Sequence, residues 1–286
     1  MSDLLRVEDL WVRFFKRGGG VVEAVRGVSF AVGRERVGIV GESGSGKTMT
    51  GRAILRLIRP PGEIRAKRIG FDGTDLMGLS ERAMRRIRGE RISMVMQDPK
   101  FSLNPVMTAG EQIMEAYRLH TGAPRGEARA RMIEMLEAVQ IRDAERVAGL
   151  YPHEVSGGMG QRIMIAMMLA PDPDLLIADE PTSALDVTVQ MSVLQIMDRL
   201  VRERGMGLIF VSHDLNLVAS FCDRVLIMYG GRIVETCRAG ALNEARHPYT
   251  RALLESLPRL DRPKPRLSVM RRDPAWLEEP SVDAFA

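Results

Sequence analysis

Cysteine is scarce in this 286-residue chain, which contains only Cys222 and Cys237. Neither belongs to a closely spaced pair, so the sequence predicts no disulfide framework and no cysteine-based metal site. Long apolar runs are also missing. The longest extends from Ile163 to Ala170 and ends at Pro171, far short of the roughly 18 residues that span a bilayer. We therefore expect no membrane-spanning segment.

A secretion signal is absent as well, because the start Met1-Ser2-Asp3 lacks basic residues and an apolar core. This predicts a cytosolic chain. Aromatic residues make up only 5% of the sequence, and the net charge is +4. Such a charge suits nucleic acid or an anionic membrane face, but arginines such as Arg82 and Arg88 are scattered, with few aromatics for base stacking. We favour a solvated basic surface and expect no nucleic-acid partner.

One stretch organises the chain and matches a phosphate-binding pattern at every fixed position. It reads Gly41-Glu42-Ser43-Gly44-Ser45-Gly46-Lys47-Thr48. A predicted buried strand, Arg36 to Val40, precedes it, and a predicted helix, Met49 to Ile58, follows it. The glycines let backbone N–H groups and the helix's positive end surround an anion. Lys47 would then neutralise phosphate charge and Thr48 would bind Mg²⁺. The alternative is a simple glycine-rich turn before a helix.

Further polar residues follow predicted strands. Asp179 and Glu180 end the apolar run that begins at Leu175. The first can hold Mg²⁺ through water, and the second can orient or deprotonate an attacking water. His213 follows another apolar run, at the strand end where α/β sheets place ligands, and we predict that it contacts a γ-phosphate. For Asp179 and Glu180, the alternative is a strand end that meets solvent. For His213, the alternative is a structural histidine.

Gln97 ends the strand-like run from Arg91 to Met96, so it can reach into a site, although alone it reads as an ordinary loop residue. Alternating runs on either side of Gly18-Gly19-Gly20 predict antiparallel strands. Phe14 or Phe15, at the end of the first run, could stack on a nucleotide base. A core aromatic is the equal alternative.

The pattern from Thr108 to Ala170 is helical, and it separates Lys47 from Asp179 by far more than one βαβ crossover needs. We therefore predict a helical subdomain inserted into a nucleotide-binding sheet. Within it, Ser156 can cap a helix whose first N–H groups form a second anion site. If both anion sites hold one nucleotide, the simplest geometry is a head-to-tail dimer with two sandwiched nucleotides. A plain capped helix is the alternative.

The rest of the chain predicts four features. The first is a helix that begins after Ser183 to Asp186 and ends at about Arg202, and the second is a hairpin across Gly230-Gly231. The third is a helix from Pro248 to Leu257. The fourth is an extended or disordered tail beyond Pro258, which is rich in proline and charge. We therefore predict a nucleotide-binding domain over 1–257, with its helical subdomain at about 108–170, and a tail over 258–286.

Taken together, these residues resemble the ATP-binding subunit of an ABC transporter, over about residues 4 to 257. The resemblance implies an α/β P-loop NTPase core with an antiparallel β subdomain and an inserted α-helical subdomain. It also implies roles for the motifs of the sheet ends and loops: Gly41 to Thr48 as the Walker A loop, Gln97 as the Q-loop, Leu175 to Asp179 as the Walker B strand and Glu180 as the catalytic glutamate. Ser156 to Gln161 would be the signature, and Ser183 to Asp186 the D-loop. His213 would be the switch histidine and Phe14 the base-stacking aromatic. Catalysis would use Glu180, His213, Gln97 and Lys47. Beyond Phe14 and the Walker A loop, the nucleotide would contact Thr50, Ser156, Gly157, Gly158 and Asp186. Mg²⁺ would be held by Thr48, Gln97 and Asp179.

The finer resemblance is to the dipeptide, oligopeptide and nickel importer branch. It rests on phrases such as Gln97-Asp98-Pro99, Ser102-Leu103-Asn104-Pro105, Tyr151-Pro152-His153-Glu154 and His247-Pro248-Tyr249-Thr250. Met159 after two glycines resembles the branch's first ATPase subunit, which pairs with a different second one. Gly160 departs from the bulkier residue usual there, which implies a looser start of the signature helix. The tail lacks the cysteine-rich segment of many first subunits, so no iron–sulfur cluster is expected.

The resemblance implies an ATPase that binds Mg·ATP and powers uptake of peptides or a related solute, such as nickel chelates. Its partners would be a second homologous ATPase subunit, two membrane permeases and an extracytoplasmic binding protein. It would lie at the cytoplasmic face of the bacterial inner membrane. The alternatives are an exporter ATPase, a soluble ABC ATPase acting on ribosomes or DNA, and a non-hydrolysing regulatory subunit. The sequence leaves the cargo open.

Overall fold

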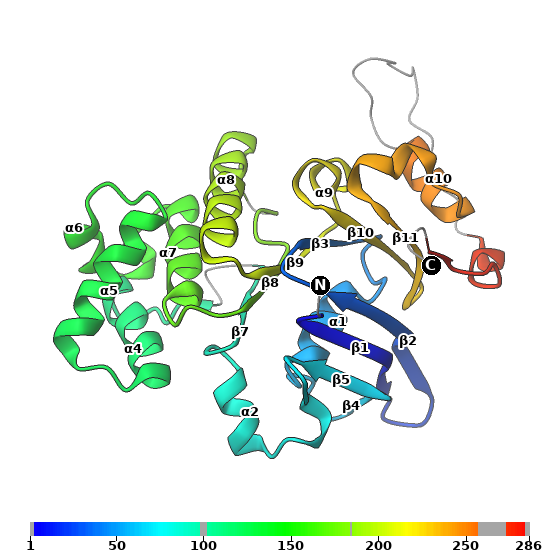
Figure 1. The fold of residues 1–286 in the computed structure, drawn as a ribbon, viewed down its shortest axis with the longest axis horizontal. Coiled ribbons are helices and arrows are strands. Elements are labelled where there is room, and N and C mark those ends of the chain that lie inside the picture. Colours follow the sequence, from blue (N-terminus) through cyan, green and yellow to red (C-terminus); the bar gives the residue numbers. More distant parts are fainter. Residues whose placement is uncertain (1–2, 98–101, 184, 257–272, 284–286) are drawn as a thin grey trace. The chain divides into compact units, whose positions relative to one another are not determined.

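The computed structural model describes residues 3–97, 102–183, 185–256 and 273–283 (Figure 1). The chain divides into two compact units, which we describe separately. The helical unit comprises Met1–Leu4, Gly33–Glu35 and Gly78–Ile209, and the sheet unit comprises Leu5–Val32, Arg36–Met77 and Phe210–Ala286. Helices and strands occur in both, in agreement with the predicted α/β class. Across the described ranges, no helix has the length and apolar character to cross a bilayer.

The sheet unit contains an antiparallel sheet built around its first strand. The strands are β1 (Leu5–Phe15), β2 (Val21–Val32), β4 (Gly62–Arg65), β5 (Arg68–Phe71) and β6 (Thr74–Asp75). β1 pairs with β2, β4 and β5. Its buried residues step from Val7 to Leu10 across a register shift, where Asp9 takes a positive φ of 50°. The predicted antiparallel pair around the glycine turn is thus confirmed, with a bulge that the alternation did not indicate.

A second sheet in the same unit leads into the predicted phosphate loop. β3 (Arg36–Val40) lies parallel to β10 (Arg224–Tyr229), which forms the predicted hairpin with β11 (Arg232–Arg238). The strand order is β12-β11-β10-β3, followed by β9 (Gly207–Ser212), which crosses the boundary of the two units. At Gly38 a Cβ atom would lie 2.2 Å from the Val218 side chain of α9 (Leu215–Phe221). The helix therefore packs directly on the β3 backbone.

The helical unit contains most of the helices and two paired strands. Its helices are α2 (Glu81–Ile87), α4 (Ala109–Thr121), α5 (Arg125–Ala138), α6 (Ala144–Ala148), α7 (Gly157–Leu169) and α8 (Val187–Arg204). β7 (Ile92–Val95) and β8 (Leu175–Asp179) pair in parallel. All regular elements between residues 108 and 170 are helices, as predicted. Ser80, Ser156 and Asp186 cap α2, α7 and α8 with their side chains.

The helix after the phosphate loop, α1 (Lys47–Ile54), is shorter than the predicted Met49 to Ile58. Its end is a Schellman turn, in which Arg56 N–H donates to Ala53 O at 2.9 Å and Leu57 N–H donates to Arg52 O at 2.8 Å. Arg56 takes the left-handed conformation, with φ of 52°, that glycine usually supplies. The prediction was wrong because arginine at this position gives no stop signal.

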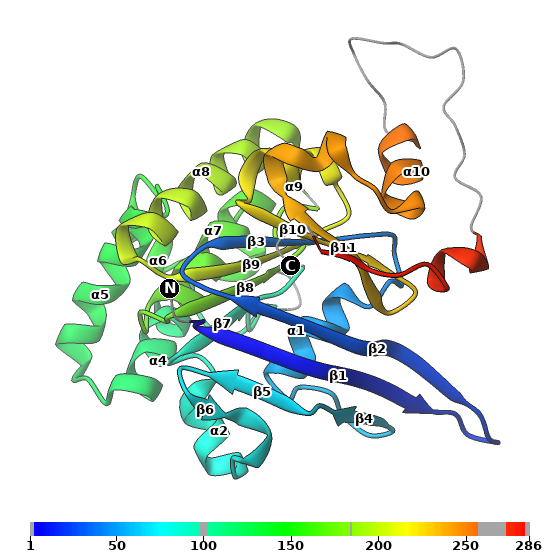
Figure 2. The same ribbon diagram turned by 45° about the vertical axis from the view of Figure 1, so that its right-hand side comes forward.

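The predicted extended or disordered tail is also wrong for residues 273–283. Pro274–Leu277 form a 3-10 helix, and β12 (Val282–Asp283) pairs in parallel with β11 (Figure 2). The Trp276 ring packs on Tyr229 of β10 and on Tyr249 of α10 (Pro248–Ser256). Composition could not reveal this contact, because both partners lie far away in the sequence. Residues 258–272 and 284–286 of the predicted tail, and Leu257 of the predicted helix, lie outside the described residues.

The close packing at Gly38 gives a test of stability. We expect Gly38→Ala to lower the free energy of unfolding by about 1–3 kcal/mol, because Val218 must move away from the added methyl group. The control is Gly126→Ala in α5, where no atom lies within 4 Å of the added Cβ. There a better helix former should raise stability by up to about 1 kcal/mol. Urea unfolding midpoints measure both. A Gly38→Ala midpoint at or above the wild-type value would contradict the packing.

Candidate functional site

The predicted phosphate loop connects β3 to α1, and the side chain of its lysine is hydrogen-bonded to the loop backbone. Lys47 is 5% exposed. Its Nζ donates to Gly41 O at 2.8 Å and to Glu42 O at 2.9 Å. Ser45 N–H donates to Glu42 O at 3.1 Å, which adds a tight turn inside the loop. The ammonium group therefore lies across the loop, next to the backbone that would face an anion.

Glycine is required in this loop because the backbone passes very close to neighbouring strands. A Cβ atom at Gly46, where φ is 105°, would lie 2.5 Å from Ala24 O, and one at Gly41 would lie 2.1 Å from Met228 O. Gly46 is also the N-cap of α1 and offers no side-chain cap to the helix's first N–H groups. Uncapped N–H groups at a helix start, beside a lysine, are the donors that bind phosphate. The loop thus fits a phosphate group.

Contacts from distant parts of the sheet unit hold the loop in place. Gly231 N–H, in the β10–β11 turn, donates to Ser45 O at 3.1 Å. Glu42 N–H donates to the Tyr249 hydroxyl at 3.1 Å, and Tyr249 is fully buried. Neither contact could be predicted from the sequence. For Tyr249 the only available signal was the His247-Pro248-Tyr249-Thr250 phrase, which indicates a family but no contact.

Three other predicted site residues belong to the sheet unit. Phe14 is half-buried beside Gly62, where an added Cβ would lie 2.8 Å from its ring, and Phe15 is the more exposed neighbour. His213 is exposed and directly precedes Asp214, which caps α9. Thr50 is fully buried, and its hydroxyl donates to Gly46 O at 3.0 Å. Its side chain therefore supports the loop from within α1, and its predicted nucleotide contact stays a prediction.

The helical unit brings two predicted catalytic residues together. Gln97 Nε2 donates to Glu180 Oε2 at 3.1 Å. Glu180 follows β8 with a positive φ of 47°, which is uncommon for a residue other than glycine. Asp179, the last residue of β8, is only 2% exposed. The backbone thus turns sharply between the two carboxylates and directs one of them to the Gln97 amide.

The predicted second anion site also lies in the helical unit, at the start of α7. Ser156 Oγ accepts from Met159 N–H at 3.3 Å, which confirms the predicted cap. At Gly157 an added Cβ would meet no atom within 4 Å, whereas at Gly158 it would lie 2.6 Å from Val189 of α8. Gly158 is thus needed for the packing of α7 against α8, whereas neighbouring side chains leave space beside the Gly157 backbone. α7 is regular through Gly160.

The predicted site residues are therefore divided between the units. The sheet unit holds Phe14, Gly41 to Thr48, Thr50 and His213, and the helical unit holds Gln97, Ser156 to Gly158, Asp179, Glu180 and Asp186. Asp186 accepts from Thr188 N–H and Val189 N–H at the start of α8. The predicted Mg²⁺ ligands come from both units, so this ligand set stays a prediction.

A buried histidine lies beside the residue that contacts the loop. His247 is 1% exposed, and its Nδ1 accepts from Tyr249 N–H at 3.2 Å. Burial lowers the pKa of His247, an effect that the carboxylates of Glu235 and Glu279 partly offset. Glu235 is itself buried, and its Oε1 accepts from Arg246 N–H at 2.7 Å. The neutral imidazole therefore helps to fix the start of α10.

The family model for ABC transporters matches residues 25–183, which include the phosphate loop, β8 and Glu180. The chain belongs to the ABC transporter family. A second model, described as the C-terminal region of oligopeptide/dipeptide transporters, matches residues 235–282 of this ABC protein. That match covers Tyr249, Trp276 and part of β12.

Relatives and solved structures agree with this assignment. The oligopeptide transport ATP-binding protein OppD of Bacillus subtilis (strain 168) is 46% identical over the whole chain and 81% of its own length. The dipeptide transport ATP-binding protein DppD of Escherichia coli (strain K12) is 45% identical over 93% of this chain and 81% of its own. The ATP-binding cassette MJ0796, solved as a dimer bound to ADP and Pi, has a TM-score of 0.73 and 28% identity, over 82% of this chain and 98% of that one. These similarities confirm the predicted ABC ATPase fold.

The buried histidine predicts a pH dependence of stability. Because the pKa of His247 is lower in the folded chain, the unfolded chain binds a proton first as the pH falls below about 6.5. Stability should therefore decrease from pH 7 to pH 5, by at most about 1.4 kcal/mol per pH unit from this group. In His247→Asn, the amide oxygen can still accept from Tyr249 N–H but does not titrate. We expect the free energy of unfolding, measured in urea, to decrease less from pH 7 to pH 5 in that variant than in the wild type. An equal decrease in both proteins would contradict this account.

Proposed function

We propose that this chain is the ATP-hydrolysing subunit of an ABC importer that takes up peptides or a related small solute, such as nickel chelates. One observation carries the proposal: a phosphate loop of the required geometry precedes, in the same chain, a match to the C-terminal region of oligopeptide/dipeptide transporters. The relatives named for oligopeptide and dipeptide transport support the same substrate class. The importer reading is thereby favoured over an exporter.

Nucleotide binding is proposed to rest on the phosphate loop, Gly41 to Thr48. The uncapped start of α1 and the Lys47 ammonium would bind the phosphates. Phe14 would stack on the base. Thr48, Gln97 and Asp179 would hold Mg²⁺, which when bound would neutralise phosphate charge. Carboxylate, amide and hydroxyl oxygens are the ligands that Mg²⁺ prefers. No iron–sulfur cluster is part of the proposal.

Hydrolysis is proposed to depend on the paired side chains of Glu180 and Gln97. An acceptor carboxylate that is hydrogen-bonded to an amide can orient a water and take up its proton. The positive φ of Glu180 fixes the direction of that carboxylate. His213 would donate to the transferred phosphoryl group. Catalysis would thus consist of positioning and charge stabilisation, as in phosphoryl transfer generally.

A second homologous ATPase subunit is proposed to complete each nucleotide site. Ser156, Gly157 and Asp186 would contact nucleotide across that interface in a head-to-tail dimer. Two apolar side chains at the start of α8 support such an interface: Val187 is 75% exposed and Met191 is 50% exposed. Because they are four residues apart on a helix, they lie on one face next to Asp186.

Permeases are proposed to dock on the helical unit, so that the chain lies peripherally at the cytoplasmic face of the membrane. A mostly apolar cavity of about 500 Å³ opens there. It is lined by Leu103, Pro105, Pro152, His153, Val155, Ser156, Gly157 and Gly160. Leu103 and Pro105 line one part of the cavity and the start of α7 lines another, so an inserted permease segment would contact both. An extracytoplasmic binding protein would deliver the solute.

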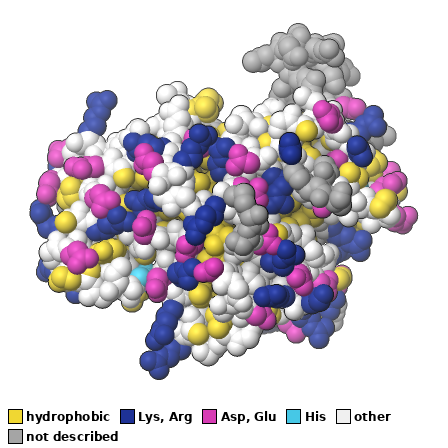
Figure 3. All heavy atoms as spheres, in the orientation of Figure 1, with side chains coloured by type: hydrophobic (Ala, Val, Ile, Leu, Met, Phe, Trp, Pro, Cys, Tyr) yellow, Lys and Arg dark blue, Asp and Glu magenta, His cyan; other side chains and the backbone are white. Residues whose placement is uncertain are grey.

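A soluble ABC ATPase acting on ribosomes or DNA remains the rival from another class. On the face that Figure 3 shows, Lys and Arg side chains are interspersed with Asp and Glu, and they form no continuous basic stripe. Nucleic-acid binding would favour such a stripe. We therefore keep the transport function as the proposal.

Replacement of the proposed base tests the chemistry. We expect Glu180→Gln to bind Mg·ATP as tightly as the wild type and to lose turnover by about 10²–10⁴-fold, because the amide cannot accept the proton. Glu203→Gln, near the exposed end of α8, makes the same chemical change in the same unit and should keep wild-type turnover. Nucleotide titration and phosphate release measure both properties. Wild-type turnover in Glu180→Gln would remove Glu180 from this role.

Crosslinking tests the proposed permease contact. Burial raises the pKa of Cys222 to about 12 and that of Cys237 to about 11, so both native thiols should react slowly. A single Pro105→Cys substitution in the full chain, in membranes of its own cell, should crosslink to a hydrophobic permease. Glu203→Cys should not.

Purification in mild detergent should also recover a second ATPase and two permeases. A chain recovered alone, or with ribosomes or DNA, and without a Pro105→Cys crosslink would overturn the transport proposal but not the ATPase chemistry.

A further inference from the structure

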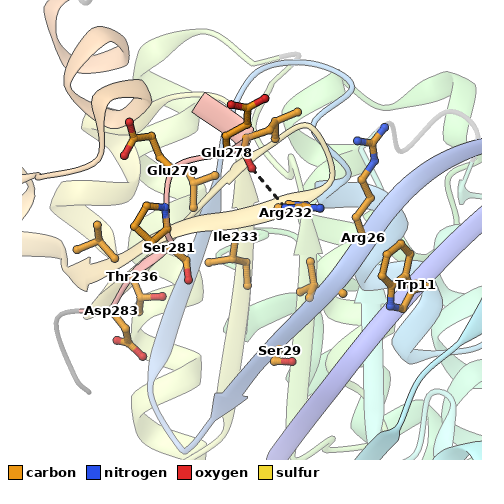
Figure 4. Close-up of a pocket in the computed structure, with 16 residues that line it drawn as sticks. Trp11, Arg26, Ser29, Arg232, Ile233, Thr236, Glu278, Glu279, Ser281 and Asp283 are labelled. Atoms are coloured by element: carbon orange, nitrogen blue, oxygen red, sulfur yellow. Dashed lines mark hydrogen bonds between the residues drawn. The ribbon is translucent and has the colours of Figure 1, made fainter. Parts of the chain in front are cut away.

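The C-terminal segment, residues 273–283, forms an aromatic cluster with α10 and β10. The rings of Tyr229 and Tyr249 lie with centroids 4.4 Å apart, and the Trp276 ring lies 5.6 Å from each of them. Arg232 Nη1 donates to Leu277 O at 3.3 Å, which fastens the segment to β11 (Figure 4). The Trp276 indole therefore contributes to the complete burial of Tyr249.

The same segment lines one side of an open cavity of about 670 Å³ on the sheet unit. Figure 4 shows Glu278, Glu279 and Ser281 of the segment on one side, with Trp11 and Arg26 of β1 and β2 on the other. No residue of the phosphate loop lines this cavity. Any influence of the segment on the loop must therefore pass through direct contacts and hydrogen bonds and not through a shared pocket.

Tyr249 provides such a connection. Its hydroxyl accepts from Glu42 N–H, while Lys47 Nζ binds the Glu42 carbonyl oxygen. The Glu42 residue is thus held by Tyr249 at its N–H group and by the phosphate-binding lysine at its carbonyl. A tyrosine has only two side-chain torsions, so the rings of Tyr229 and Trp276 can fix where its hydroxyl lies.

A parallel path passes through the β10–β11 turn. A Cβ atom at Gly230 would lie 2.9 Å from the Leu277 side chain, so the segment packs directly on the turn. The next residue, Gly231, donates its N–H to Ser45 O of the loop. The segment therefore packs on Tyr249, which binds Glu42, and on the turn whose next residue binds Ser45.

We propose that Tyr249 is a positioning residue for the phosphate loop and that the C-terminal segment, through Trp276, sets the affinity of the loop for ATP. The inference rests on the proposed function, because it takes the loop as the ATP site. A segment that is packed on Tyr249 holds the Glu42 backbone and Lys47 in one arrangement before ATP binds. Release of the segment gives Tyr249 rotational freedom and weakens binding, because part of the binding free energy then has to order the loop.

The first test is Tyr249→Phe in the full chain, which keeps the ring and removes only the hydroxyl. One hydrogen bond of ordinary net strength corresponds to about a three- to tenfold change in affinity. We expect the Kd and KM for Mg·ATP to rise by about that factor, with kcat within about twofold of wild type. The matched control is Tyr117→Phe, which removes a tyrosine hydroxyl bonded to Glu127 at 2.8 Å in the helical unit. It should leave both constants unchanged.

The second test asks whether Trp276 acts through Tyr249. Trp276→Ala alone should weaken ATP binding to a similar degree, whereas in the Tyr249→Phe background it should change the Kd by less than about twofold. A merely structural role would lower the melting temperature and the active fraction in each variant without such non-additivity in Kd. If the rise in Kd of the double variant equalled the product of the rises in the two single variants, the role of Trp276 would be overturned.

The failures of the inference and of the proposed function can be distinguished. A wild-type chain that does not bind Mg·ATP removes the proposed function. A wild-type chain that binds Mg·ATP, together with Tyr249→Phe protein of equal Kd, removes only the positioning role of Tyr249.

Discussion

At Gly46 the backbone of the phosphate loop passes so close to β2 that a Cβ atom would lie 2.5 Å from the Ala24 carbonyl oxygen. This constraint organises the sheet unit. It places the start of α1 against the antiparallel sheet, leaves the first N–H groups of α1 without a side-chain cap, and lets Lys47 fold back on Gly41 and Glu42. Because the loop has so little room, its shape depends on the strands and turns that surround it.

The part of the candidate site for which we propose a catalytic role depends on a different constraint, the sharp turn after β8. A positive φ at Glu180 separates the direction of its side chain from that of the buried Asp179. The Gln97 amide then meets Glu180 within one unit. The phosphate loop belongs to the other unit, so each unit carries a locally complete part of the site. Such a division suits an ATPase whose turnover is coupled to movement, since each part can keep its own geometry.

Short-range features of this chain could be predicted from its sequence, and long-range ones could not. The phosphate loop, the cap at Ser156, the helix start near Asp186 and the glycine-linked hairpins follow from local chemistry, because the deciding residues lie within a few positions of each other. The end of α1 was mispredicted because Arg56 takes a conformation that the sequence rules assign to glycine. The docking of Trp276 and the bond from Glu42 to Tyr249, which joins residues 207 positions apart, depend on tertiary packing alone. The His247-Pro248-Tyr249-Thr250 sequence indicated the family but not the contacts that Tyr249 makes.

The pairing of β12 with β11 also has a consequence for association. In the sheet order, β11 would be the outermost strand without β12. An uncovered outer strand presents unpaired backbone N–H and C=O groups, to which a strand of another molecule can add. β12 occupies this position at Glu235 and Thr236. The last described strand therefore protects a sheet edge, and the chain keeps its own C-terminal segment where a neighbouring protein could otherwise bind.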